Sequence, residues 1–442
     1  MNKSRSVKNS VKNASLVALC LLMLLLCVAS WLSGLGIAQM PADSLLRRVH
    51  DHMFGGASGY ELRSSGVAAA DPAQVALTVD GQLTAVQYSL SEVDAGVQAV
   101  RTVWSEALGG GSTLDAVEED EFDRALAAGD CALLHYDGAI PVSAIAGWFG
   151  GRWENDLAVR TLLYAAGENR LYVRGADGAL YAAGTKVDSG SWQNAQREFR
   201  GQPCAFSGKQ YAVLPETLLF DRETLSFPLL MPAENDLFGE ASDVSLQTLL
   251  SAFSYTPHAR FYPEQDDTIR VFVDNASTLR ISGGGEVQYT ASGTGGTVFA
   301  YEEGKADGVD ALDAQIDCAR LVLDTALRAT DAETRGSLYA VQQTSGLTTL
   351  VFMQTYNGVP VLSGTDFATF VFRDGALVSA TVSLQKFLAD DTRQTVMPAK
   401  QAAVSATESQ NELIVAYRMQ DGVYRPARYF LAGSADAATT DS

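Results

Sequence analysis

The 442-residue chain has few of the side chains that most often carry out enzymatic chemistry. It contains four histidines and five cysteines, and the patterns C-x-x-C, H-E-x-x-H and G-x-S-x-G do not occur in it. Those patterns usually mark zinc sites, thioredoxin-type dithiols and serine hydrolases. We predict a protein without enzymatic activity, catalytic residue, cofactor or metal ion. A hydrolase that assembles distant carboxylates is the alternative, because none of the 52 acidic residues can be singled out.

Positive charge is scarce as well. The chain carries 32 Lys and Arg residues against 52 Asp and Glu, a net charge of −20. Lys3, Arg5, Lys8 and Lys12 lie in the first 15 positions without any acidic residue, so the remainder has 28 basic residues and a net charge of −24. A surface this acidic repels nucleic acid, whose binding requires a basic patch. We therefore predict no nucleic-acid partner.

Charge is missing altogether from the 23 residues between Leu16 and Ala38. About 20 apolar residues suffice for a helix to cross a bilayer, and the basic residues before the run predict that its N-terminal side is cytoplasmic. We predict a cytoplasmic tail over 1–15, a single transmembrane anchor over 16–38 and a body outside the cell membrane. A signal peptide cleaved after Gly36-Ile37-Ala38 is the alternative, although its apolar core would exceed the usual length of about 7–15 residues.

Small residues recur every four positions at the outer end of this run. Ser30, Gly34 and Ala38 therefore share one face of a helix. Small residues at this spacing let transmembrane helices approach closely, so we predict that this face binds a partner. The alternative is that these residues only mark the outer end of a signal sequence.

Beyond the anchor the chain has three cysteines, Cys131, Cys204 and Cys318. Their odd number and wide spacing do not match a disulfide framework, so we expect buried free thiols with at most one disulfide. His135 follows Cys131 by four residues. On a strand that separation is about 13 Å at ~3.3 Å per residue, which is too far for a catalytic pair, and we interpret both residues as structural.

The body has the pattern of an α+β protein with two or three mixed domains built on antiparallel sheets. A segment rich in Pro, Asn, Gly and Ser predicts a linker from Pro228 to Asp243, and small polar residues predict a disordered C-terminal end. The predicted parts are a juxtamembrane connector over 39–59, a first α+β domain over 60–232, a small helix-plus-sheet domain over 244–300, a helix with an antiparallel meander over 305–388, and a disordered tail over 430–442.

Turn residues and helical spacing predict the elements of the first domain. Apolar stretches flank Asp80-Gly81, a strong hairpin signal. Ser89 and Glu92 form a capping-box pattern ahead of a helix that ends at Gly109. A second helix is predicted over 115–127. Its acidic run lacks the ligand spacing and glycine of an EF-hand, so we expect no calcium there.

The next strand, Cys131–Tyr136, is predicted to turn at Asp137-Gly138. In the later domains, apolar residues at helical spacing predict a helix over 309–329, and Asp374-Gly375 predicts a hairpin. The residues expected on the buried face of that helix are Leu312, Ile316, Ala319, Leu323 and Leu327.

Two stretches resemble the YycH/YycI family. The first, ALLHYDGAIPVSAI from Ala132 to Ile145, is similar to a hydrophobic strand, turn, Ile-Pro and helix of that family. The second begins at Leu249 and runs LLSAFSYTPHARFYPEQDDTIRVFVDNASTLRISGGGEVQYTA, similar to the family's central helix and strands. The resemblance implies a non-enzymatic, membrane-anchored regulator of Gram-positive bacteria that acts outside the cell on the WalK sensor histidine kinase. It further implies a second YycH/YycI-like protein as a partner.

Residues 309–387 also resemble a PepSY-type module. The resemblance rests on the helix, on TYNGVPV from Thr355 to Val361 and on the Asp374-Gly375 hairpin. Such modules occur in secreted protease propeptides, where they inhibit or chaperone. The alternative function is therefore an anchored or secreted module that binds proteases at the cell envelope, although no peptidase domain is attached.

Overall fold

A computed structural model describes residues 69–109, 113–153, 157–221, 224–235, 237–239, 243–256, 259–265, 267–274, 277–292, 309–330, 334–364, 366–407 and 412–431. The chain divides into two compact units, residues 1–59 and 60–442, and all described residues lie in the second. The predicted cytoplasmic tail, anchor and connector lie outside the described residues. Among those that are described, no helix has the length and apolar character needed to cross a membrane.

Among the described residues, eight strands form the first sheet, and each neighbouring pair is antiparallel. The hairpin predicted at Asp80-Gly81 is confirmed, and both residues have the positive φ angles of a type I′ turn. The strand order is β8 (Gln202–Phe206), β2 (Gln82–Gln87), β1 (Gln74–Val79), β4 (Cys131–Pro141), β5 (Ala158–Ala165), β6 (Arg170–Gly175), β7 (Leu180–Gly184) and β3 (Asp115–Ala116), and β9 (Leu218–Phe220) continues from β8.

Helices cover both faces of the first sheet. On one face, α3 (Leu90–Leu108) packs against α6 (Ser189–Glu198) and β1. On the other, α4 (Glu119–Ala127) buries Phe122 against Leu133 of β4. The helix predicted after Ser89 is confirmed, but the Ser89 side chain makes no capping hydrogen bond. The second helix begins at Glu119, later than predicted, because Asp115 and Ala116 pair with β7.

The second sheet consists of two units, each a helix followed by strands. The strand order is β11 (Phe261–Glu264), β12 (Ile269–Val273), β13 (Ser277–Ser282), β14 (Glu286–Ala291), β19 (Ala376–Ser383), β18 (Ala368–Arg373), β16 (Leu347–Tyr356) and β15 (Thr334–Thr344). The units meet where β14 pairs with β19. Strands from the predicted ranges 244–300 and 305–388 therefore share one sheet.

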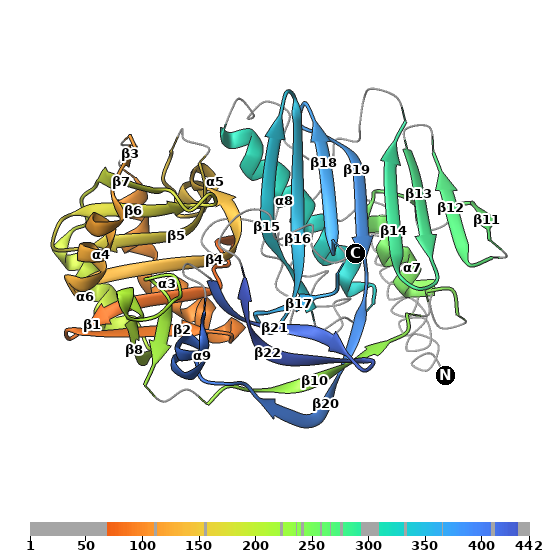
Figure 1. Cartoon of the computed structure of the whole chain (residues 1–442). Coiled ribbons are helices and arrows are strands. Elements are labelled where there is room, and N and C mark those ends of the chain that lie inside the picture. Colours follow the sequence, from red (N-terminus) through yellow and green to blue (C-terminus); the bar gives the residue numbers. More distant parts are fainter. Residues whose placement is uncertain are drawn as a thin grey trace, which may run out of the picture. The chain divides into compact units, whose positions relative to one another are not determined.

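Two helices, α7 (Asp243–Ala252) and α8 (Val309–Arg328), contact each other and lie on one face of this sheet (Figure 1). The helix predicted over 309–329 is confirmed. The hairpin at Asp374-Gly375 is confirmed too, with positive φ at both residues. All five residues predicted on the buried face of the helix are buried, and Leu323 and Ile316 are completely so.

The third sheet brings together strands from distant parts of the chain. Its order is β20 (Lys386–Thr395), β10 (Ser226–Ala233), β22 (Val423–Leu431), β21 (Glu412–Gln420) and β17 (Val359–Leu362), and β17 runs parallel to β21. The predicted linker is wrong in its first part, because Pro228 to Ala233 belong to β10. The predicted disordered tail begins too early, since Phe430 and Leu431 end β22; residues 432–442 lie outside the described residues.

Strand β4 connects the first sheet to the second. Its pairing with β5 is interrupted after His135 and resumes at Ile140, and within this bulge Ala139 pairs with Ala340 of β15. Gly138 permits the close approach, because a Cβ atom there would lie 2.1 Å from the backbone oxygen of Tyr339. The turn predicted at Asp137-Gly138 is therefore wrong: the strand continues through a bulge. The described body is an α+β structure, as predicted.

Candidate functional site: a buried ionic cluster

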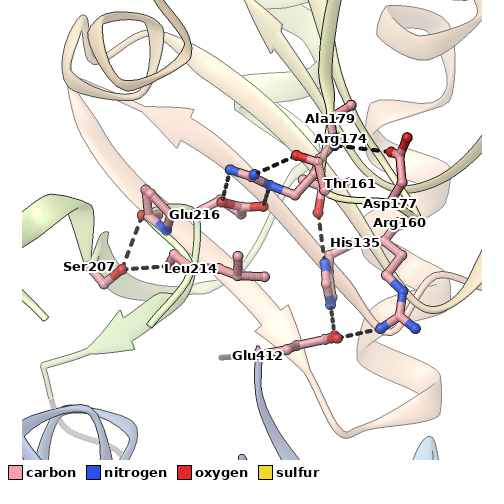
Figure 2. Close-up of polar contacts among 12 residues, drawn as sticks. His135, Arg160, Thr161, Arg174, Asp177, Ala179, Ser207, Leu214, Glu216 and Glu412 are labelled. Atoms are coloured by element: carbon pink, nitrogen blue, oxygen red, sulfur yellow. Dashed lines mark hydrogen bonds and ion pairs between the residues drawn. The ribbon is translucent and has the colours of Figure 1, made fainter. Parts of the chain in front are cut away.

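A cluster of charged side chains lies where β4, β5 and β21 meet. The Glu412 carboxylate on β21 bonds to two cationic groups at once: its Oε1 is 2.8 Å from His135 Nε2, and its Oε2 accepts from Arg160 Nη1 at 2.5 Å. Figure 2 shows Glu412 between these two side chains, with Thr161 on the far side of the imidazole. The Thr161 hydroxyl is 3.0 Å from His135 Nδ1. The glutamate is 4 % exposed and the histidine 8 %, so these bonds form away from bulk water.

Asp137 completes the cluster. One ligand atom from each of His135, Asp137 and Glu412 lies within 4.8 Å of the others. Burial raises the pKa of Asp137 to about 7; the charges of His135 and Arg160 act against this rise, and that of Glu412 adds to it. A carboxyl group with this pKa exchanges its proton near neutral pH. We refer to His135, Asp137, Arg160 and Glu412 as the ionic cluster.

The mutual contacts of the cluster set the pKa values of its other members. Burial alone would lower the pKa of His135, but the hydrogen bond and the negative charge of Glu412 outweigh burial and raise it. Burial alone would raise the pKa of Glu412, but its hydrogen bonds and attractions to His135 and Arg160 lower it. The pair therefore favours the imidazolium and carboxylate forms.

The β4 bulge explains how two polar groups enter an apolar strand together. His135 lies directly opposite Thr161 in the β4–β5 ladder, and regular pairing stops after it. Residues 136–139 then leave the register of β5, and an oxygen of Asp137 lies within 4.8 Å of ligand atoms of His135 and of Glu412 on β21. Bulges commonly redirect a side chain in this way.

A second buried ion pair lies close to the cluster. Arg174 of β6 forms two hydrogen bonds with Glu216, from Nε at 2.5 Å and from Nη2 at 3.0 Å (Figure 2). Both side chains are more than nine-tenths buried. Such a two-pronged contact satisfies both partners, so this pair is a structural connection between β6 and the segment that precedes β9.

A small cavity adjoins the cluster. Its volume is about 30 Å³, and Asp71, Tyr136, Asp137, Arg335 and Ser337 are among the residues that line it. Drug-sized ligands occupy pockets of roughly 300–1,000 Å³, so this cavity has room for water-sized molecules only. The buried Tyr136 hydroxyl has no hydrogen-bond partner within the described part of the chain.

The cluster has the residue types of a metal site but not the arrangement. A histidine and two carboxylates can bind a divalent cation. Here, however, His135 and Glu412 already bond each other, and the positive charge of Arg160 lies 2.5 Å from the same carboxylate. A cation at this point would break the first contact and be repelled by the second. We therefore interpret the cluster as a set of ion pairs and assign no metal ligand.

The three cysteines in the described part of the chain offer no activated thiol. Cys131, Cys204 and Cys318 are free; the first two are buried and the third is partly exposed. Burial raises the pKa of each thiol to about 12. The thiolate is the nucleophilic form, so these side chains are inert at neutral pH. Cys131 Sγ lies near the Thr78 hydroxyl, whereas His135 contacts Thr161 and Glu412, and the structure does not bring the cysteine and histidine together.

The acidic run that begins α4 is occupied by ion pairs. Glu121 pairs with Arg170 of β6, and Asp120 and Asp123 both pair with Lys209 in the short 3-10 helix η3 (Gly208–Gln210). The carboxylates of Asp120, Glu121 and Asp123 are therefore paired with basic side chains. The predicted partner-binding residues Ser30, Gly34 and Ala38 lie outside the described residues.

An open hollow of about 400 Å³ lies between α6 and the β1–β2 turn. Its lining includes Asp80, Gln193, Gln196, Arg197 and Arg200. Both arginines are exposed, and Arg200 donates to the backbone oxygen of Phe199. Because both arginine side chains are exposed to solvent, the hollow is a weaker candidate for a binding site than the ionic cluster.

Comparisons with known proteins do not assign this chain to a family. No family model, curated protein or solved structure matches the chain. The functional argument therefore rests on the residues themselves.

Sequence reasoning missed the cluster, although three of its members stand out in the sequence. His135 lies in CALLHY, Arg160 in AVRTLLYA and Glu412 at the start of ELIVAY. Each is a single charged or titratable residue next to apolar strand residues. Such residues are rarely buried unless they are paired, and this was the available signal. The partners remained unknown, because 277 positions separate His135 from Glu412.

Proposed function

We propose that this chain is a membrane-anchored regulator whose body lies outside the cell, where it binds and modulates a two-component sensor histidine kinase without catalysing a reaction. The observation that carries the proposal is the 23-residue uncharged run from Leu16 to Ala38 behind a basic tail. The resemblance to the YycH/YycI family supports the class of partner, with a second protein of that family as another candidate.

Features of the body support binding over catalysis. Within the ionic cluster, the Glu412 carboxylate already bonds both His135 and Arg160, and the adjoining cavity holds water-sized molecules only. The described cysteines carry raised pKa values. An enzyme needs a reactive group with access to substrate, and none of these groups combines the two properties.

The anchor offers a physical route to regulation. Ser30, Gly34 and Ala38 on one helix face would let a transmembrane helix of the kinase approach closely. A partner shifts a signalling equilibrium only by its difference in affinity for the two states. Regulation therefore requires that the two states of the kinase pack against this face unequally.

Crosslinking in native membranes, followed by identification of the captured proteins, tests this function. We expect a sensor histidine kinase among them, and we expect Gly34→Leu to weaken its capture while the protein stays in the membrane fraction. Gly36→Leu is the matched control, because the same change two positions away lies on the opposite side of the helix. Loss of the anchor by cleavage, seen as a released species beginning at Gln39, would end the proposal.

A PepSY-type protease-binding module is the second candidate. The order of elements favours this candidate. Helix α8 is followed by the strands β15 to β19, and together they occupy the range that resembles such a module. Capture of secreted proteases alone, with no effect of Gly34→Leu, would favour this function over kinase regulation.

A further inference from the structure

Strand β21 reaches the first sheet through the ionic cluster. Glu412 is its first residue and bonds His135 of β4 and Arg160 of β5. Three positions later, the Val415 backbone N–H donates to the Tyr88 hydroxyl at 2.9 Å. Along the rest of its length β21 pairs with β22 and β17 in the third sheet. The cluster is therefore an ionic connection between the C-terminal hairpin and the first sheet.

We propose that the ionic cluster is a pH-dependent latch: protons held by Asp137 and His135 keep β21 attached to the first sheet in mildly acidic conditions, and their loss at alkaline pH loosens it. The inference concerns the body of the chain and does not depend on which partner the protein binds. If the body lies outside the cell, as proposed above, the latch responds to external pH.

Charge counting within the cluster explains the direction. When both protons are bound, Glu412 faces two cations, His135 and Arg160, while Asp137 is neutral. When both protons are lost, Glu412 keeps Arg160 alone and gains Asp137 as a negative neighbour. Attraction between buried charges is strong, and so is repulsion. The attachment of Glu412 therefore weakens as the cluster loses protons.

Neighbouring elements add further charges around the cluster. Asp71, ahead of β1, makes the surroundings of Asp137 more negative, and Arg335 of β15 lines the same cavity. Glu216 favours the protonated form of His135, but it is itself paired with Arg174. Tyr339 of β15 faces Arg160. Asp137 and His135 are therefore the cluster members whose bound protons are lost as the pH rises.

The sign of the pH dependence follows from the pKa directions. Asp137, with its pKa raised from 3.8 to about 7, binds its proton more tightly in the attached state, so the latch weakens as pH rises between these values. The pKa of His135 is raised above 6.5, so loss of its proton weakens the latch further above pH 6.5. The lowered pKa of Glu412 acts in the opposite sense and matters only below about 4.5. The latch is therefore strongest between about pH 3.8 and 4.5 and weakens above that range.

Hydrogen–deuterium exchange of the full-length chain in detergent micelles, at pH 5.5 and pH 8.0, measures the latch directly. Each rate is divided by the intrinsic amide rate at the same pH. One proton taken up on closing changes the opening equilibrium by up to about tenfold per pH unit, so we expect protection of 413–420 to fall roughly tenfold or more between the two conditions. Protection of 277–291 in the second sheet should fall clearly less.

Asp137→Asn is the decisive variant. It removes a titrating carboxyl while keeping its shape, so β21 should lose most of its pH dependence below pH 7 and should be better protected than the wild type at pH 8.0. Asp391→Asn is the matched control, since Asp391 is exposed on β20, and it should keep the wild-type profile. His135→Gln is a second test, because this variant should lose the pH dependence of β21 protection above about pH 6.5.

Three results would overturn the latch. The first is equal protection of β21 at both pH values, and the second is a full wild-type pH dependence in Asp137→Asn or, if that variant does not fold, in His135→Gln. The third is a loss of protection that extends equally to the second sheet. Asp317 of α8 also has a pKa raised by burial to about 7, and its titration would produce such a general effect.

Discussion

Single residues decide where the sheets of this protein touch. Gly138 lets β4 approach the backbone of β15, and Glu412 ties β21 to two strands of the first sheet. A buried ion pair adds little net stability compared with apolar residues of the same shape, but removing one partner leaves the other charge uncompensated. The cluster therefore mainly determines which strands meet, and removing one of its members destabilises the fold.

Glu412→Gln should lower the free energy of unfolding by about 3–5 kcal/mol at pH 6, because it leaves Arg160 buried without its counter-charge. Urea unfolding of the full-length chain, followed by tryptophan fluorescence, measures the change. Glu264→Gln is the control: its partner Arg280 is about 40 % exposed, and surface pairs are worth roughly 0–1 kcal/mol. Equal effects of the two substitutions would show that Glu412 is not a buried ionic contact.

Among the elements, α8 has the clearest agreement between pattern and packing. The five apolar residues predicted on its buried face recur at helical spacing, and all five are buried in the core that α8 shares with the second sheet. Leu323 lies so close to β15 that a Cβ atom on Gly336 would be 2.3 Å from its Cδ2 atom. Helix and strand are therefore matched in shape at this point, with the glycine making room for the leucine.

Leu323→Ala should destabilise the protein by about 2–5 kcal/mol, the usual range for truncation of a fully buried leucine. Leu321→Ala is the matched control on the same helix, because Leu321 is only partly buried and its truncation should cost clearly less. Thermal and urea unfolding of both variants provide the comparison. A melting temperature unchanged by Leu323→Ala would mean that the helix does not pack as described.

At the scale of the whole body, the C-terminal segment joins parts of the chain that are far apart in sequence. Strands β21 and β22 share a sheet with β10 and β17, and the core beneath them includes Tyr88, Phe227 and Tyr417. Residues from three distant regions are therefore buried together, and the core is incomplete without the last 40 described residues or so.

A chain that ends at residue 388, the predicted limit of the last domain, should consequently expose this core. We expect it to bind a hydrophobic dye and to aggregate, because β10 loses most of its neighbour β20 and all of β22. A chain ending at residue 431 is the control and should behave like the full-length protein. A monomeric, dye-free 1–388 protein would show that the third sheet is dispensable for folding.

Local order was predictable from the residues alone. The helix 309–329, the hairpins at Asp80-Gly81 and Asp374-Gly375 and the α+β class depend on side-chain periodicity and turn chemistry within a few positions of each other. The prediction of an anchor, with its partner-binding face, also comes from sequence and stays a prediction. Tertiary structure alone decided that Asp137-Gly138 forms a bulge, that Pro228 to Ala233 form a strand, and that His135 meets Glu412. Each of these outcomes depends on which strand lies alongside, and the free energy of that pairing comes from contacts between residues hundreds of positions apart.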